Sequence, residues 1–399
     1  MNTLPDDLAE GPTQFSSAHG KRVSRIAFGL CGLFTAISFF GATRDIRQFS
    51  HSWLFAFAFA FTISVGALFW TILHNSTDSE WGVLVRRQME NLSSGLWVLP
   101  IAFIPLVLFC APSLWKWWQT PSGVDVLLDL KSAFLNKSFF CVRSALYFLS
   151  LGYLAFALRR HSVLQDASGS SFHTYRVRRL SISGLPILAV CLTFAAVDWL
   201  MALDHHWFST MWGVYVFAGS AGSSMALLVI LVAWLRRSGY LLQINVEHFH
   251  VMGKFLLAFT VFWAYVGFSQ YMLIWYANIP EETIYFKVRN TGGWHVLSTL
   301  LVIGRFFIPF PILLFQSSKK KAPILLPVCA WIILMQLLDV YLIVMPALKP
   351  DGFSPSFLDA TCLIAVCTLC VGVFFRSLRR SALFPLRDPR LGGSVSLHN

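Results

Sequence analysis

The sequence predicts an all-α, polytopic membrane protein. Of its 399 residues, 56% are hydrophobic and only 13% are charged, whereas soluble domains have about 25% charged residues. The mean hydropathy is +0.63. The apolar residues gather in runs of roughly 20, the length with which an α-helix crosses a bilayer. Many of the 15 Trp and 37 Phe stand near the ends of these runs, as in an interfacial aromatic belt.

About ten runs are long enough to span a membrane. They cover 25–42, 53–73, 95–112, 138–158, 181–201, 209–235, 251–276, 293–315, 323–346 and 356–376. The loops between them are short and polar, so no soluble domain is predicted. The chain is therefore divided into an N-terminal tail (1–24), a ten-span membrane domain (25–376) and a C-terminal tail (377–399).

The N-terminal 20 residues are polar and acidic. They lack the basic segment and apolar core of a cleaved signal peptide, so the first apolar run is expected to be a retained span. The chain has no CxxCH motif, so covalently bound haem is not expected. Most histidines lie in loops or at span edges, which also argues against a dihaem cytochrome b.

Basic residues set the predicted orientation. Of the 31 Lys and Arg, 21 fall on one side of the ten spans and 8 on the other, while Arg143 and Arg305 lie within spans. Cytoplasmic loops are enriched in basic residues, so both tails are expected in the cytoplasm. This distribution attributes the net charge of +12 to topology rather than to nucleic-acid binding.

Five spans place polar side chains at a similar depth, counted at about 1.5 Å per residue from the outer ends. They are Arg143, Asp198, Gln270, His295 and Asp339. A carboxylate in lipid must pair or take up a proton. Arg143 is expected to pair with Asp198 or with Asp339, which leaves the other acid free to carry protons. The alternative is a structural polar network that holds the helices together.

Further ionisable residues surround this level. Asp204, His206, Glu281 and Glu282 lie just above it. Arg305 lies deeper and follows His295, Ser298 and Val302 on one helical face, which suggests a polar stripe leading inward. Alternatively, the Arg305 side chain extends to the cytoplasmic interface.

Aromatic residues crowd the seventh run. Trp263, Tyr265, Tyr271, Trp275 and Tyr276 are suited to line a pocket for a flat ring such as that of a quinone. The alternative for any one of these residues is that it only packs against other helices or contacts lipid.

Three segments carry a family resemblance. They read DWLMALDHHWFSTMWGVYVFAGS, GKFLLAFTVFWAYVGFSQYMLIWYANIPEET and DVYLIVMPAL. They resemble the F subunit of bacterial alternative complex III, a quinol:electron-acceptor oxidoreductase, which belongs to the NrfD-like membrane proteins. The resemblance covers roughly residues 180–350 and extends to the remainder by span count.

The resemblance implies two four-helix bundles, spans 2–5 and 6–9, flanked by spans 1 and 10. It implies a bacterial inner-membrane subunit that is a scaffold with a possible role in quinol binding or proton transfer and has no redox cofactor of its own. Quinol would be the substrate of the complex. The implied partners are a multihaem cytochrome c, an iron–sulfur protein, the paralogous C subunit, membrane lipid and a terminal oxidase.

Two positions depart from the family pattern, in which a Pro often stands at position 205 and a His at position 305. This chain has His205 and Arg305. An arginine cannot relay protons as an imidazole can, which weakens a proton path through Arg305.

Two other classes of function remain open at this point. A proton- or ion-coupled secondary transporter would use Asp198 and Asp339 as coupling sites, but no pair of spans split by Gly or Pro is predicted. A purely structural anchor would use neither acid chemically.

Overall fold

The structure is a computed structural model that describes residues 11–398. Within this range, ten helices are long and apolar enough to cross a membrane, and no strand is formed. The predicted all-α, ten-span class is therefore confirmed. The uninterrupted spans are α1 (Ser17–Ala42), α2 (Ile46–Ser76), α7 (Lys137–Ser168), α8 (Ser171–Trp199), α9 (Trp212–Arg237), α10 (Val246–Ala277), α15 (Ala322–Val344) and α16 (Phe357–Leu378).

Two spans in the described part of the chain are built from several pieces. The third consists of α3 (Val83–Ser93), η2 (Ser94–Trp97), α4 (Leu99–Pro105), η3 (Leu106–Cys110) and α5 (Ala111–Leu114). The eighth consists of α12 (Gly292–Val302), η6 (Ile303–Phe307) and α13 (Pro309–Leu314). Both η3 and η6 are π-helical turns, and each lies beside proline, which lacks the N–H that an α-helix needs. The expectation that no pair of spans is interrupted is thus wrong.

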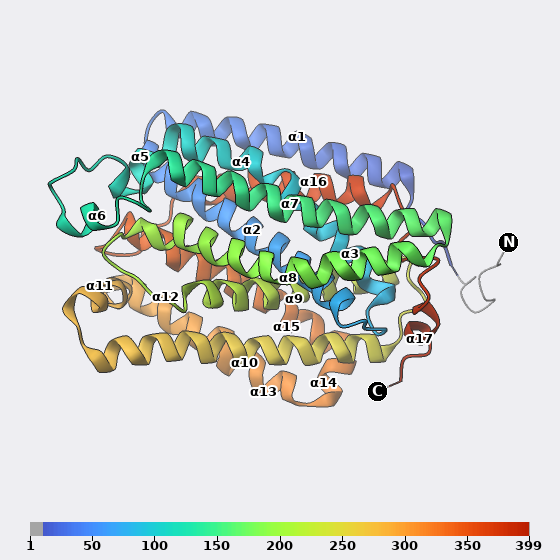
Figure 1. Ribbon diagram of the computed structural model, residues 1–399. Coiled ribbons are helices and arrows are strands. Elements are labelled where there is room, and N and C mark those ends of the chain that lie inside the picture. Colours follow the sequence, from blue (N-terminus) through green and yellow to red (C-terminus); the bar gives the residue numbers. More distant parts are fainter. Residues whose placement is uncertain (1–10, 399) are drawn as a thin grey trace.

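Short helices lie between the spans and, in the case of α17, after the last one. They are η4 (Lys116–Trp118), α6 (Val126–Leu130), η5 (Met201–Leu203), α11 (Pro280–Arg289), α14 (Gln316–Lys320), η7 (Met345–Ala347) and α17 (Leu391–Val395). In Figure 1, α6 and α11 lie at one end of the molecule, and the start of α1 and the helix α17 lie at the other.

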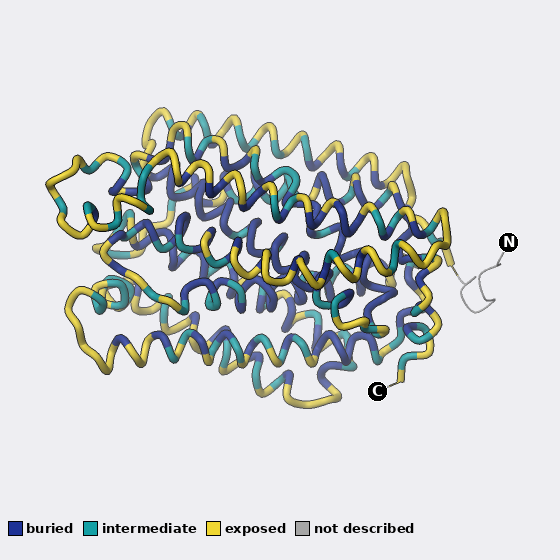
Figure 2. Tube along the Cα trace, viewed as in Figure 1, coloured by how far each residue is buried: buried dark blue, intermediate teal, exposed yellow. Residues whose placement is uncertain are grey.

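Spans 2–5 and spans 6–9 form the two predicted four-helix bundles. In the first, α2 packs on α3 and α8, and α7 packs on α8 and η2; in the second, α9 packs on α10 and α15. The two bundles meet along α2 and α9, while α1 packs along α16, which itself contacts α2. Figure 2 shows the resulting pattern, with buried positions along the middle and exposed positions along the edges.

Helix α2 is the centre of the molecule and is buried along most of its length. Gly66 makes the close approach to α9 possible. A Cβ at this position would overlap the carbonyl oxygen of Ser220 and the hydroxyl of Ser224. The two bundles therefore share a tightly packed seam.

The C-terminal segment packs on the end of the bundles. The Leu383 N–H donates to the Thr13 carbonyl at 2.8 Å, and the Leu386 N–H donates to Asp166 Oδ1 at 2.9 Å. The described part of the predicted tail 377–399 is thus docked, with Leu386 bonded beside the α7–α8 turn. Of the predicted tail 1–24, residues 1–10 lie outside the described residues, and α1 already begins at Ser17.

Candidate functional site

Arg143 and Asp198 form an ion pair between α7 and α8. Arg143 Nε lies 2.9 Å from Asp198 Oδ2 and Nη2 lies 2.7 Å from Oδ1. Tyr147 Oη also donates to Oδ2, at 2.7 Å. The Asp198 side chain is 0% exposed, and Arg143 Nη1 donates to the carbonyl of Phe134 at 2.8 Å. Of the two predicted partners of Arg143, the structure selects Asp198, whose charge is fully compensated.

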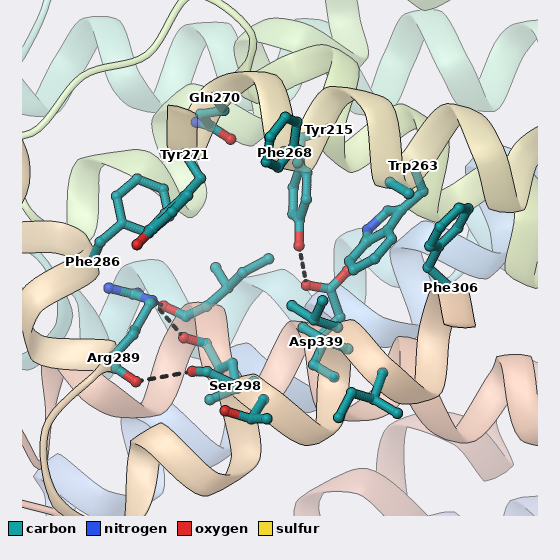
Figure 3. A pocket seen from close by; sticks show the side chains of 18 of the residues that line it. Tyr215, Trp263, Phe268, Gln270, Tyr271, Phe286, Arg289, Ser298, Phe306 and Asp339 are labelled. Carbon is teal, nitrogen blue, oxygen red and sulfur yellow. Dashed lines mark hydrogen bonds between the residues drawn. The ribbon is translucent and has the colours of Figure 1, made fainter. Parts of the chain in front are cut away.

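Asp339 has a different environment. It lies on α15, is 3% exposed, and accepts hydrogen bonds from Tyr215 Oη at 2.5 Å and Trp263 Nε1 at 3.1 Å. No Arg or Lys of residues 11–398 lies within ion-pair distance of it. Asp339 is therefore a buried acid whose described hydrogen-bond donors are all neutral, a property that it shares with Asp359 of α16. Figure 3 shows the hydrogen bond from Tyr215 to Asp339.

A cleft of about 740 Å³ opens beside Asp339. Its walls come from α10 on one side and from α12 and η6 on the other, with α9 and α15 behind and α11 at one end (Figure 3). Side chains along the mouth, such as Phe268, Val302 and Phe307, are more than half exposed. The mouth thus faces sideways, toward the lipid-facing surface of the spans rather than toward either end.

The cleft has an aromatic lining with few polar groups. Three of the five aromatic residues expected to form a ring pocket line it: Trp263, Tyr265 and Tyr271. Trp275 and Tyr276 are not among its lining residues and are 65% and 82% exposed. Apolar pockets with a few placed polar groups are typical ligand sites.

Gln270 and Arg289 are the polar groups nearer the end of the cleft at which α11 lies. Gln270 is 5% exposed, and its Nε2 has no hydrogen-bond partner among the described residues. Arg289 Nε and Nη2 donate to the carbonyls of Leu342 and Ile343 at 2.9 and 3.0 Å. These carbonyls belong to the last turn of α15, where a cation stabilises the helix.

Arg305 lies between the cleft and the second bundle's core. Its Nη2 donates to Gln336 Oε1 at 2.6 Å, and its guanidinium lies 4.9 Å from the Trp263 ring centroid. Since Arg305 is only 3% exposed, the alternative in which it extends to the interface is wrong. The predicted stripe is also not formed as one buried face, because His295 and Val302 are exposed.

The five residues expected at one level do not share one polar centre. Arg143 and Asp198 form the first centre, Asp339 and Gln270 line the cleft, and His295 is exposed. Sequence reasoning missed Tyr215 and Arg289. Two sequence features could have identified them. Tyr215 places a hydroxyl within an apolar run, and Arg289 lies on the side of the membrane predicted to have few basic residues.

The remaining predicted residues lie outside the cleft. Glu281 and Glu282 occupy the first turn of α11, where carboxylates stabilise a helix N-terminus. Asp204 and His206 belong to a separate cluster with Asp125 and His205. His205 Nε2 and His206 Nε2 lie 2.9 and 3.0 Å from Asp125 Oδ2.

Asp125 is held in place by its neighbours. Its Oδ1 accepts the N–H groups of Leu127 and Leu128, at 3.0 and 3.2 Å, as the N-cap of α6. The hydrogen bond from His205, with that from Leu128, lowers the pKa of Asp125 to about 2. The carboxylate is therefore ionised at neutral pH.

Comparison with known proteins adds no relative: no protein-family model matches the chain, and no curated protein matches it. The lining of the cleft still defines its chemistry. A flat, amphipathic ring can enter from the lipid side, stack on the aromatic walls and present a hydroxyl to Asp339. A carboxylate in that position can accept the proton of the hydroxyl.

Proposed function

We propose that this chain is a membrane subunit of a quinol:electron-acceptor oxidoreductase of the alternative complex III type, and that the cleft binds the quinol head group. The carrying observation is Asp339, a buried carboxylate without an ion-pair partner in the described chain, in an aromatic cleft that opens toward lipid. Quinols dissolve in the bilayer, so a lateral mouth is the entry that such a substrate needs.

The residues of the cleft have different roles in this proposal. The rings of Trp263, Tyr271 and Phe306 provide apolar faces for the head group. Asp339 accepts a proton as the quinol is oxidised. Gln270 supplies an amide N–H with no partner among the described residues, suited to the oxygen at the other end of the ring.

Oxidation of a quinol releases two protons and two electrons. In this proposal Asp339 accepts one proton, the second proton passes to water, and the two electrons pass to the redox centres of partner subunits. The partners named by the resemblance, a multihaem cytochrome c and an iron–sulfur protein, meet this requirement. The paralogous C subunit and a terminal oxidase complete the proposed assembly in the bacterial inner membrane.

The assembly is tested by purifying the chain from its own membranes in a mild detergent. The expected result is co-purifying c-type haem absorbance and quinol-dependent reduction of an acceptor. A colourless chain that purifies alone and oxidises no quinol would contradict the proposal.

The cleft is tested with a photoreactive quinone. Labelling is expected on peptides of α10 and α12, and Val302→Trp should block it because Val302 lines the mouth and is 51% exposed. Val296→Trp is the matched control, since Val296 is also exposed on α12 but does not line the cleft. Equal labelling in both variants would place the quinone elsewhere.

A proton- or ion-coupled secondary transporter is the second candidate. The π-helical interruptions η3 and η6 favour it, because broken helices are common at transporter binding sites. In that case Asp339 would bind the coupling ion. Reconstituted vesicles separate the two: a transporter moves a solute with a proton gradient when no other subunit is present.

A further inference from the structure

Asp125, His205 and His206 bring three metal-binding groups together at the end of the molecule opposite α17. One ligand atom from each residue lies within 4.8 Å of those of the other two. Asp125 begins α6, whereas the two histidines follow η5, about 80 residues later. We propose that these three side chains bind a zinc ion that ties the α6 loop to the end of α8.

The donor set fits zinc. Zn²⁺ is bound by imidazole nitrogen and carboxylate oxygen, whereas Mg²⁺ and Ca²⁺ prefer oxygen ligands alone. In a tetrahedral site with bonds of 2.0–2.1 Å, neighbouring ligand atoms are about 3.3 Å apart. The imidazole Nε2 atoms already lie 2.9 and 3.0 Å from Asp125 Oδ2. Shifts of a few tenths of an ångström would bring both of these nitrogen–oxygen distances to the tetrahedral value.

The ligands are already oriented. Asp125 is fixed by the N–H groups of Leu127 and Leu128. The His205 side chain is 6% exposed, and its carbonyl accepts a hydrogen bond from Lys131 Nζ at 2.7 Å. Such supporting contacts hold metal ligands in position.

Charge and access also favour a cation. Asp204 adds a second carboxylate, with Oδ1 3.8 Å from His206 Nδ1. The carboxylates of Asp125 and Asp204 both act on the ammonium of Lys131, so this group of described side chains has a net negative charge with neutral histidines. His206 is 51% exposed, which gives the ion a path from solvent and leaves a coordination position for water.

Zinc would stabilise an outer loop that is also bonded to the membrane domain. The Phe134 carbonyl accepts a hydrogen bond from Arg143, so residues 125–134 are anchored at one end by Arg143 and at the other by the histidines. Closing the metal site would restrict this segment further. Protease cleavage after Lys131 should therefore become slower when zinc is bound.

The test uses the full chain in detergent, purified through a tag without histidine and stripped with a chelator. Zn²⁺ affinity is measured by competition with a fluorescent chelator, and Co²⁺ is used as a coloured probe of tetrahedral geometry. We expect one bound ion per chain and a tetrahedral Co²⁺ spectrum. His206→Ala and Asp125→Asn should each weaken binding by about tenfold or more.

His295→Ala is the matched control, because His295 is exposed and lies in the first turn of α12. It should leave affinity and spectrum unchanged, and zinc should protect the loop from trypsin in this variant as in the wild type. His206→Ala should lose that protection. The proposal is overturned if the wild type binds no more tightly than His206→Ala, or if His295→Ala removes the ion.

Discussion

Arg143 and Asp198 face each other across α7 and α8 through two side-by-side hydrogen bonds of 2.9 and 2.7 Å. Such a paired geometry fixes both position and charge. Asp339, by contrast, receives bonds from the neutral donors Tyr215 and Trp263. Asp198 and Asp339, two of the buried acids in the described spans, thus differ in role: Asp198 holds helices together, and Asp339 is the candidate proton acceptor.

Asp198→Asn should destabilise the protein. The change leaves the Arg143 guanidinium buried without a counter-charge, which costs about 3–5 kcal/mol. The protein recovered from membranes and its unfolding temperature in detergent should both fall. The double variant Arg143→Gln/Asp198→Asn should recover part of the loss, because it buries no unpaired charge. An unchanged unfolding temperature in the single variant would show that the pair is dispensable.

Asp339→Asn should reduce function more than stability. The amide oxygen still accepts from Tyr215, while loss of the acceptor for Trp263 costs about 1–3 kcal/mol. An amide cannot accept the quinol proton, so turnover should fall by about 10²-fold or more. The assembled complex is quantified by its haem absorbance, and turnover and proton release are then measured per haem. Tyr215→Phe keeps the carboxylate and serves as the control. Normal turnover in Asp339→Asn would remove Asp339 from the mechanism.

Reporter fusions should place Ser170 in the cytoplasm and Ser354 on the opposite side. Ser170 lies in the α7–α8 turn, on which the C-terminal segment packs through Leu386 and Arg387. Ser354 precedes α16, one span away from that end. An alkaline phosphatase reporter, which is active only on the oxidising outer side, and a fluorescent reporter, which is active in the cytoplasm, distinguish the two sides. The same side for both fusions would contradict the ten-span topology.

Asp388→Asn should destabilise the docked C-terminal segment in a pH-dependent way. Burial opposes ionisation of Asp388, but the guanidinium groups of Arg86 and Arg390 hold its pKa well below the usual range. Because the folded-state pKa is depressed, the stabilisation is present above the unfolded-state pKa of about 3.9 and is lost as pH falls through the folded-state value.

At pH 7 the Asp388→Asn variant should therefore be less stable than the wild type by about 3 kcal/mol, since Arg86 loses a buried partner. Unfolding temperatures of both proteins from pH 7 to pH 3 give the test. The difference should be constant near neutrality and shrink below about pH 4. A difference that grows on acidification would contradict the assignment.

Hydropathy located all ten spans, but it underestimated several of their lengths. The third span begins at Val83 rather than at residue 95, because Arg86, Arg87 and Glu90 are buried in mutual ion pairs. In the sequence alone, these charged residues look like part of a polar loop, because their ion-pair partners are not apparent. The same reasoning explains the C-terminal segment, whose Arg390 pairs with Asp78 and Asp388 only in the folded chain.

The polar residues of the spans were recognised, but their grouping was not. Counting residues from a span end gives depth, and Asp198 and Asp339 have similar depths. It does not give the direction around the helix axis, which places Asp198 against Arg143 and Asp339 against Tyr215. His295 was counted into the same level, and its exposure likewise depends on that direction. Contacts between distant helices are needed to settle it.

The seam at Gly66 has a mechanical consequence. If one bundle slid or rocked on the other, α2 would have to separate from α9. At Gly66 the two helices are so close that there is no room for a Cβ beside the backbone of Ser220. Closely packed interiors have low compressibility and transmit strain. A force applied by a neighbouring protein on α1 or α16 would thus be transmitted through α2 and α9 to the walls of the cleft. The two bundles should therefore move as one rigid unit rather than about a hinge between them.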